Sequence, residues 1–112
     1  MARTLNEWAD EVYQNSVNHG FVETDDNIYQ KLMLIVQELC EGMEELRAGH
    51  DKHAIYYNLE KPDKPEGFPV EMADALIRLL CFMRGHGIDV EDVVNLKHTY
   101  NLSRPFKHGK AF

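Results

Sequence analysis

The chain has 112 residues and a formal net charge of −7, because 19 acidic side chains outnumber 12 lysines and arginines. This length predicts a single domain, residues 1–112, with one modest core, and the acidic balance argues against binding to nucleic acid. No apolar run approaches the ~20 residues of a membrane-spanning helix, and the N-terminus lacks a signal-peptide pattern. We therefore expect a cytoplasmic protein without a membrane partner, in which Cys40 and Cys81 are reduced thiols.

Two amphipathic helices are predicted in the first half of the chain. The first follows Thr4, because the sequence from Thr4 to Glu7 has the form of a capping box, and it ends before Gly20. Its apolar face has helical spacing and comprises Leu5, Trp8, Ala9, Val12 and Tyr13. The second helix begins among the good N-cap residues 24–27 and runs to about Ala48. Its expected buried stripe is Ile28, Leu32, Ile35, Val36, Leu39, Met43 and Leu46.

Residues 50–68 differ in composition and predict a loop, because two prolines and a glycine fall within residues 61–67. A third helix follows, with Pro69 in its first turn, and ends at the sequence Gly85-His86-Gly87. Asp89 caps a fourth helix that continues to about Leu102. No stretch shows sustained alternation of polar and apolar residues, so we predict no strand. The expected fold is all-α, a four-helix bundle with antiparallel neighbours.

Two pairs of carboxylates on consecutive predicted helices are the strongest functional signal. Glu38 and Glu41 are three residues apart on the second helix, and Glu71 and Asp74 have the same spacing on the third. Residues at positions i and i+3 share one face of a helix, so two adjacent helices would bring four carboxylates together. Such a cluster repels itself unless a cation lies within it, and oxygen ligands favour Mg2+, with Mn2+ as the alternative. On their own, however, acidic residues on a helix are usually its solvated side.

Positive charge gathers at the C-terminal end of this otherwise acidic chain. The basic side chains there are Lys97, His98, Arg104, Lys107, His108 and Lys110. They could pair with the acidic surface, or they could bind the outer phosphates of a polyphosphate whose reacting phosphate lies at a metal ion.

The ordered set of motifs resembles the MazG-like nucleoside triphosphate pyrophosphohydrolases, a family of small all-α domains. The resemblance is carried by residues 32–47 (LMLIVQELCEGMEELR), 64–80 (KPEGFPVEMADALIRLL) and 87–112 (GIDVEDVVNLKHTYNLSRPFKHGKAF). It implies hydrolysis of nucleoside triphosphates between the α- and β-phosphates, which gives a nucleoside monophosphate and pyrophosphate. It also implies a homodimer or homotetramer with active sites near the subunit contacts.

The resemblance assigns roles to particular residues of this chain. Mg2+ is expected on the paired acids Glu38, Glu41, Glu71 and Asp74. Glu38 or Glu41 is also the expected catalytic base for the attacking water. The residues expected at the phosphates are Lys97, Asn101 and Arg104, while Arg78 faces the site or a partner subunit. Gln37 departs from the family, which usually has a second acid before Glu38. A neutral amide binds a cation more weakly, so this position bears on the number of metal ions.

Two other classes remain open. A carboxylate-bridged di-iron protein also uses acids on adjacent helices, but it typically requires Glu-x-x-His pairs, and no His follows Glu38, Glu41 or Glu71 at that spacing. A non-catalytic helical interaction module would keep the fold without the chemistry, although the four acids and the basic tail speak against it.

Overall fold

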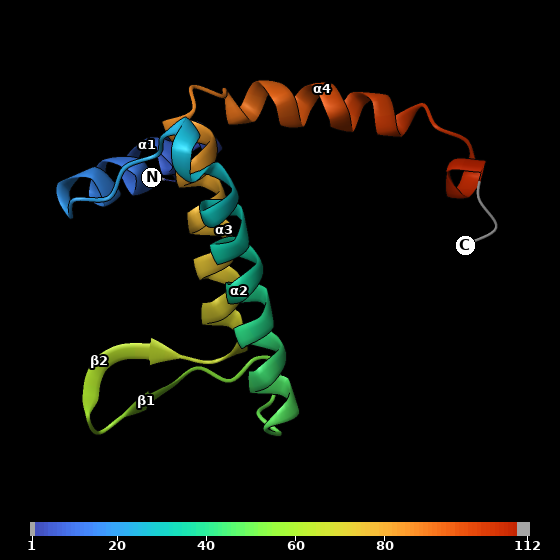
Figure 1. Cartoon of the computed structure of the whole chain (residues 1–112). Coiled ribbons are helices and arrows are strands. Elements are labelled where there is room, and N and C mark those ends of the chain that lie inside the picture. The colour runs from blue at the N-terminus through green and yellow to red at the C-terminus, as the bar shows by residue number, and fades with distance from the viewer. Residues whose placement is uncertain (1, 110–112) are drawn as a thin grey trace.

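The computed structural model describes residues 2–109, which form four α-helices, two short 3-10 turns and one β-hairpin (Figure 1). The helices are α1 (Leu5–Asn18), α2 (Ile28–Arg47), α3 (Phe68–Gly85) and α4 (Val90–Leu102). The 3-10 turns are η1 (Asp25–Asn27) and η2 (Phe106–Gly109), and the strands are β1 (Tyr56–Asn58) and β2 (Lys61–Glu66). None of the helices in this part of the chain is long and apolar enough to cross a membrane. The prediction of a mainly helical chain is confirmed.

Capping side chains begin two of the helices where the sequence predicted. Thr4 Oγ1 accepts a hydrogen bond from the Glu7 amide at 3.1 Å, and Glu7 Oε1 accepts one from the Thr4 amide at 2.8 Å, which completes the capping box of α1. Asp89 Oδ1 likewise accepts from the Asp92 amide at 2.9 Å at the start of α4. The second helix begins slightly later than predicted, because residues 25–27 form η1 before α2.

The prediction that the chain contains no strand is wrong. β1 and β2 pair antiparallel, with Tyr56 opposite Glu66 and Tyr57 opposite Pro65, and the register shifts between Tyr57 and Asn58. A proline lacks the amide that the interior of a larger sheet requires, but it is tolerated at an edge, and each strand of this two-stranded ribbon is an edge. The prolines that signalled a loop are therefore compatible with the hairpin, which links α2 to α3.

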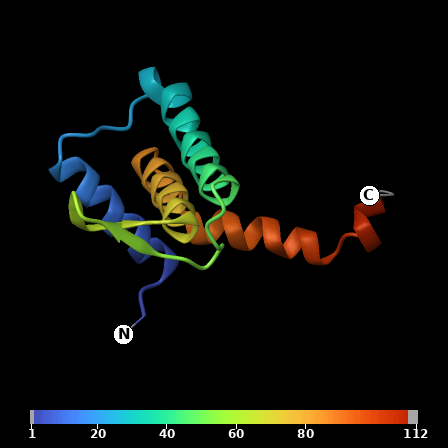
Figure 2. The same ribbon diagram turned by 90° about the horizontal axis from the view of Figure 1, so that it is seen from below.

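α2 and α3 lie side by side and antiparallel, and α1 packs across the C-terminal half of α3 (Figures 1 and 2). Gly42 is buried on α2 and lets these two helices approach, because a Cβ there would lie 2.5 Å from Met72 Cε and 3.4 Å from the Phe68 ring. The core lies where α1, α3 and α4 meet. It consists of Ala9, Leu80 and Val90, with Leu5, Val12 and Met83 packed against them.

α4 leaves the body of the chain after its start (Figure 1). The radius of gyration is 16.9 Å, against about 13 Å for a compact domain of this length. On α4, Leu96, Tyr100 and Leu102 are 70%, 57% and 74% exposed. The four helices therefore do not close into a bundle within one chain, and that part of the prediction is not confirmed.

Much of the predicted apolar stripe of α2 is also exposed. Side chains that retain between 39% and 54% of their accessible surface include Leu32, Val36, Leu39, Met43 and Leu46. Periodicity shows which face of a helix is apolar, but it does not show whether the same chain covers that face. The expectation that this stripe is buried is therefore not met within one chain.

Candidate metal centre

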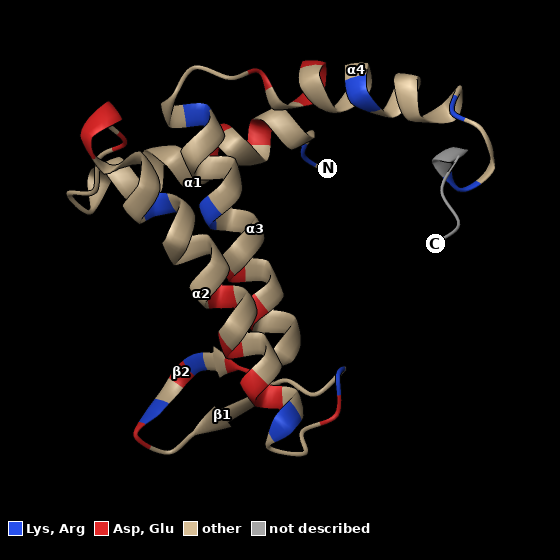
Figure 3. Cartoon of the chain, turned by 45° about the vertical axis from the view of Figure 1, so that its right-hand side comes forward, with Lys and Arg blue, Asp and Glu red and all other residues tan. Residues whose placement is uncertain are grey.

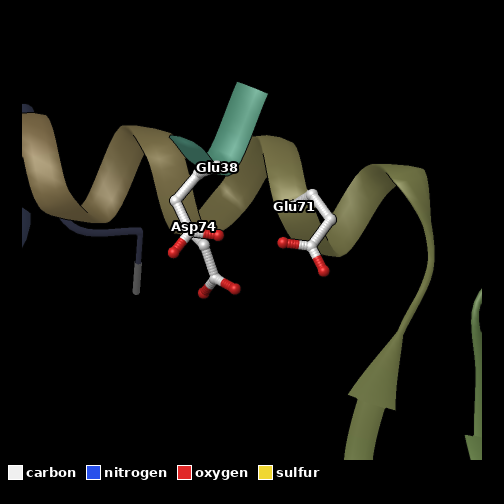
Figure 4. Close-up of side chains that lie close together, drawn as sticks. All are labelled: Glu38, Glu71 and Asp74. Carbon is white, nitrogen blue, oxygen red and sulfur yellow. The ribbon is translucent and has the colours of Figure 1, made fainter. Parts of the chain in front are cut away.

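Three of the predicted ligands converge between α2 and α3 (Figure 4). Glu38 comes from the middle of α2, and Glu71 and Asp74 come from the first turns of α3. One carboxylate oxygen from each lies within 4.8 Å of the others. Glu38 is buried and the other two are partly buried, so the cluster lies at the interface of the helices rather than on an open surface.

Glu41 lies at the margin of this cluster. Its side chain is exposed, and its Oε1 accepts a hydrogen bond of 3.2 Å from Gln37 Nε2. Its charge nevertheless acts on Glu71, because Glu41 is among the groups that raise the pKa of that carboxyl. Gln37, the position that departs from the MazG-like pattern, therefore holds Glu41 through an amide where a second acid would repel it.

Glu71 bears the largest electrostatic penalty in the cluster. Burial, with the neighbouring carboxyls of Glu38 and Glu41, raises its pKa to about 8. Its Oε2 is buried and has no hydrogen-bond partner among residues 2–109. Burial also raises the pKa of Asp74, and the negative charge of Glu38 adds to that effect. At neutral pH Glu71 therefore holds a proton that a bound cation would displace.

Glu38 titrates in the opposite direction. Burial acts to raise its pKa, but hydrogen bonds, above all from Arg78, lower it below its ordinary value. Arg78 Nε donates to Glu38 Oε1 at 3.0 Å, and it lies one turn of α3 beyond Asp74. The guanidinium supplies a countercharge to the cluster.

The donor set fits a hard divalent cation. The converging groups are all carboxylates, and Mg2+ and Mn2+ prefer oxygen ligands. Burial, with the neighbouring carboxyls, raises the pKa of Glu71 and of Asp74, so a bound cation would favour the ionised form of both groups. The unpartnered Oε2 of Glu71 offers a further lone pair. Glu38, Glu71 and Asp74 are therefore the residues that would hold the ion.

The hairpin side of the cluster contains residues to which the sequence analysis gave no role. Tyr56 Oη donates to the two carboxylate oxygens of Glu45, at 2.8 and 2.9 Å. The His50 ring stacks on Tyr56 with centroids 4.8 Å apart. A pocket of about 310 Å³ lies among these residues, Glu41 and Glu71. No spacing rule links positions 45 and 56, because their contact forms only when the chain after α2 folds back toward it.

A larger cleft, of about 690 Å³, runs from the cluster toward α1. Glu38, Asp74 and Arg78 line it from α2 and α3, and residues 20–23 line it from the α1–α2 connection. Small-molecule sites typically have volumes of about 300–1,000 Å³. Glu23 and Lys31 also line this cleft. Neither residue was predicted from the sequence. The position of Glu23 depends on how the connection lies against α3, and Lys31, on α2, gains its partner only from that contact.

The residues predicted to bind phosphate lie apart from the cluster. Lys97 and Asn101 are on α4 and Arg104 follows it, and α4 meets α1 and α3 rather than α2 (Figure 3). Lys97 Nζ and Arg104 Cζ lie 4.8 and 5.6 Å from the centroid of the Tyr100 ring, so one aromatic side chain groups both cations. Lys110, the last cation of the predicted basic tail, lies outside the described residues.

Comparisons of the chain with protein-family models, with curated proteins and with solved structures found no match. The resemblance to MazG-like enzymes stays a prediction from the motifs.

Proposed function

We propose that this chain is a Mg2+-dependent nucleoside triphosphate pyrophosphohydrolase of the MazG-like type. It cleaves ribo- or deoxyribonucleoside triphosphates between the α- and β-phosphates and releases a nucleoside monophosphate and pyrophosphate. The observation that carries this proposal is the convergence of Glu38, Glu71 and Asp74 beside a cleft of about 690 Å³. The cluster offers oxygen ligands for the cation, and the cleft has room for a nucleoside. Because Cys40 and Cys81 are free thiols, we place the enzyme in the reducing cytoplasm.

Each side chain of the cluster has a different role in the proposed reaction. The chemistry supplied by bound Mg2+ is neutralisation of the triphosphate and acidification of the attacking water. Glu38 serves as a ligand that is ionised at neutral pH, because its pKa is lowered. Glu71 would hold the cation as a carboxylate, so its raised pKa means that the cation would compete with a proton, which would pass to solvent. Glu41, exposed at the margin and held by Gln37, takes the proton from the attacking water. Arg78 exchanges its bond to Glu38 for one to a phosphate oxygen.

Hydrolysis assays test the reaction. A panel of ribo- and deoxyribonucleoside triphosphates is incubated with Mg2+ or Mn2+ and scored for monophosphate and pyrophosphate. Asp74→Asn and Glu71→Gln should each lower kcat/KM by roughly a hundredfold or more, because each removes a metal ligand. Glu44→Gln is the matched control, since Glu44 is on the same helix as Glu38 but its side chain is 70% exposed. Full turnover by Asp74→Asn, or no pyrophosphate from any nucleotide, would overturn the proposal.

We further propose that the enzyme is a homodimer or homotetramer in which α4 of one chain completes the site of another. The chain has an accessible surface of 8736 Å², whereas a compact monomer of this mass exposes about 6,300 Å². The excess is larger than the ~800 Å² that each partner buries in a standard interface. It includes the apolar faces of α2 and α4, and covering them would remove the cost of their exposure.

The charge distribution supports the same arrangement. Residues 93–112 contain 4 basic and no acidic side chains, whereas residues 1–92 contain 8 basic and 19 acidic ones. A partner's α2 and α3 therefore attract α4. Docking there would bring Lys97, Asn101 and Arg104 toward the phosphates held at the cluster.

Subunit mixing tests this contribution. Asp74→Asn removes a ligand and Arg104→Ala removes a cation, so each variant alone should have low activity. If α4 acts on a neighbouring chain, a co-expressed mixture contains sites with both native residues and regains activity. Sedimentation analysis gives the number of chains. A monomer at assay concentration, or a mixture no more active than its components, would contradict the arrangement.

A further inference from the structure

The cleft contains a second polar layer, two helical turns from the acids. Lys31 precedes Glu38 by seven residues on α2, and Cys81 follows Asp74 by seven residues on α3. Because the helices are antiparallel and an α-helix rises 1.5 Å per residue, both offsets place this layer about 10 Å from the acids in the same direction. Glu23 joins it from the α1–α2 connection. Its Oε1 lies 3.8 Å from Cys81 Sγ and 3.9 Å from Lys31 Nζ.

Glu23 is an acceptor without an adequate donor. Its side chain is 6% exposed, and its Oε2 has no hydrogen-bond partner within residues 2–109. Both contacts of Oε1 are longer than a strong hydrogen bond, and a buried carboxylate is costly unless it is paired.

The fold nevertheless makes room for the stem of the Glu23 side chain. Gly85 of α3 faces Glu23, and a Cβ at that position would overlap the Glu23 side chain. Glu23 also lines the cleft, and rotation about the last bond of a Glu side chain is soft, so either oxygen can be presented. A buried carboxylate that lines a cleft and lacks hydrogen-bond donors indicates that a ligand in the cleft supplies those donors.

The charges of Glu23 and Lys31 indicate which hydrogen-bond donors and acceptors the ligand presents to them. An ionised carboxylate only accepts hydrogen bonds and an ammonium group only donates them. Glu23 and Lys31 together therefore fit an edge with two adjacent donors beside an acceptor. Guanine has this edge, because N1–H and the 2-amino group are donors and O6 is an acceptor. Adenine has no carbonyl, cytosine has a single donor group on this edge, and uracil has one N–H between two carbonyls.

Apolar groups suit the faces of a base. Leu34 of α2 and Ile77 of α3 line the cleft between the acids and the second layer. Phe21 lines it from the connection and is 59% exposed, with Lys31 Nζ 5.6 Å from its ring centroid. An accessible aromatic ring beside a hydrogen-bonding layer is the combination that holds nucleobases in proteins.

We propose that the end of the cleft away from the acids is a guanine subsite. Glu23 accepts hydrogen bonds from N1–H and the 2-amino group, and Lys31 donates to O6. This inference rests on the proposed function, in which the acids hold the phosphates and the base extends along the cleft toward the second layer, about 10 Å away. Glu23 is then the residue that determines specificity, and it contacts the base but no phosphate.

Equilibrium binding tests the subsite without hydrolysis. NMR titrations in the presence of Mg2+ compare GMP with IMP, which lacks only the 2-amino group, and with 1-methyl-GMP, which lacks the N1–H. Loss of one hydrogen bond to a buried charged acceptor should weaken binding about tenfold or more. GMP should therefore bind more tightly than either analogue by at least that factor. This comparison uses the unaltered protein, so it does not depend on the folding of a variant.

Variants assign the preference to Glu23. Glu23→Gln should bring GMP and IMP within about threefold of each other, because the amide keeps one acceptor oxygen for N1–H but presents its donor NH2 group to the 2-amino group. Asp26→Asn is the matched control, since Asp26 is an exposed acid in η1 that does not line the cleft. It should retain the full preference for GMP.

Several results would overturn the subsite: equal binding of GMP and IMP, a preference for AMP, CMP or UMP, no binding of any monophosphate, or an unchanged GMP preference in Glu23→Gln. A protein that hydrolyses no triphosphate but still prefers GMP would refute the proposed reaction and leave the subsite standing. The two failures are therefore distinguishable.

Discussion

Replacing Glu71 by glutamine should stabilise the metal-free protein above neutral pH, although the same change removes a proposed metal ligand. A carboxyl whose pKa is higher in the folded than in the unfolded state binds more protons when folded. The free energy of unfolding therefore falls as the pH rises between the two pKa values. For Glu71 these are its ordinary 4.5 and about 8. At about 1.4 kcal/mol per pH unit the interval corresponds to ~5 kcal/mol, which is a ceiling because the side chain is partly exposed and screened.

Urea denaturation with a chelator present measures this effect at pH values below, within and above the interval. The native protein should lose several kcal/mol as the pH rises, and Glu71→Gln should lose much less. Mg2+ should raise the stability of the native protein at high pH more than that of the variant, which lacks one of the proposed ligands. The lowered pKa of Glu38 costs stability only as the pH falls below its ordinary 4.5, outside this window. Equal stability of the native protein across the interval, or a variant less stable throughout, would refute the reasoning.

Three other substitutions test the fold and the assembly. Gly67→Ala should destabilise by about 2 kcal/mol or more in thermal denaturation, because Gly67 has a φ of 130° and a Cβ would overlap the Ala54 carbonyl oxygen; an unchanged Tm would contradict this. Asn6→Ala should cost about 1–2 kcal/mol in urea, since Asn6 Nδ2 donates to Asp89 Oδ1 and Asn6 Oδ1 accepts from the Glu91 amide, both at 3.0 Å. Leu96→Lys should shift sedimentation toward smaller species, because Leu96 is 70% exposed on α4; an unchanged distribution would exclude Leu96 from the interface.

Features that depend on local signals could be predicted from the sequence. The caps Thr4 and Asp89 act on amides three residues away. The clustering of the three acids could be predicted for the same reason, because it depends on short distances along the chain. Glu71 and Asp74 share a face because of helical periodicity alone, and placing Glu38 beside them required only that consecutive helices be neighbours.

Features that depend on contacts between distant segments could not be predicted. Pro65 signals a loop, and only its pairing with Tyr57 reveals a strand. Glu23 precedes a run of N-cap residues and reads as an ordinary acid before a helix. It becomes part of the cleft because the connection packs against Gly85. The apolar stripe of α2 could be predicted, but periodicity does not show which molecule covers it.

The hydrogen bonds of Asn6 limit what a single chain can do. They tie the start of α4 to the start of α1, and α4 then runs away from α2 (Figure 1). With these bonds in place, α4, which carries Lys97, contacts α1 and α3 and not the helix that carries Glu38. Under the proposed assembly, turnover per chain should therefore fall on dilution even though every chain stays folded. Below the concentration at which the chains associate, the protein would then hydrolyse little of the nucleotide pool.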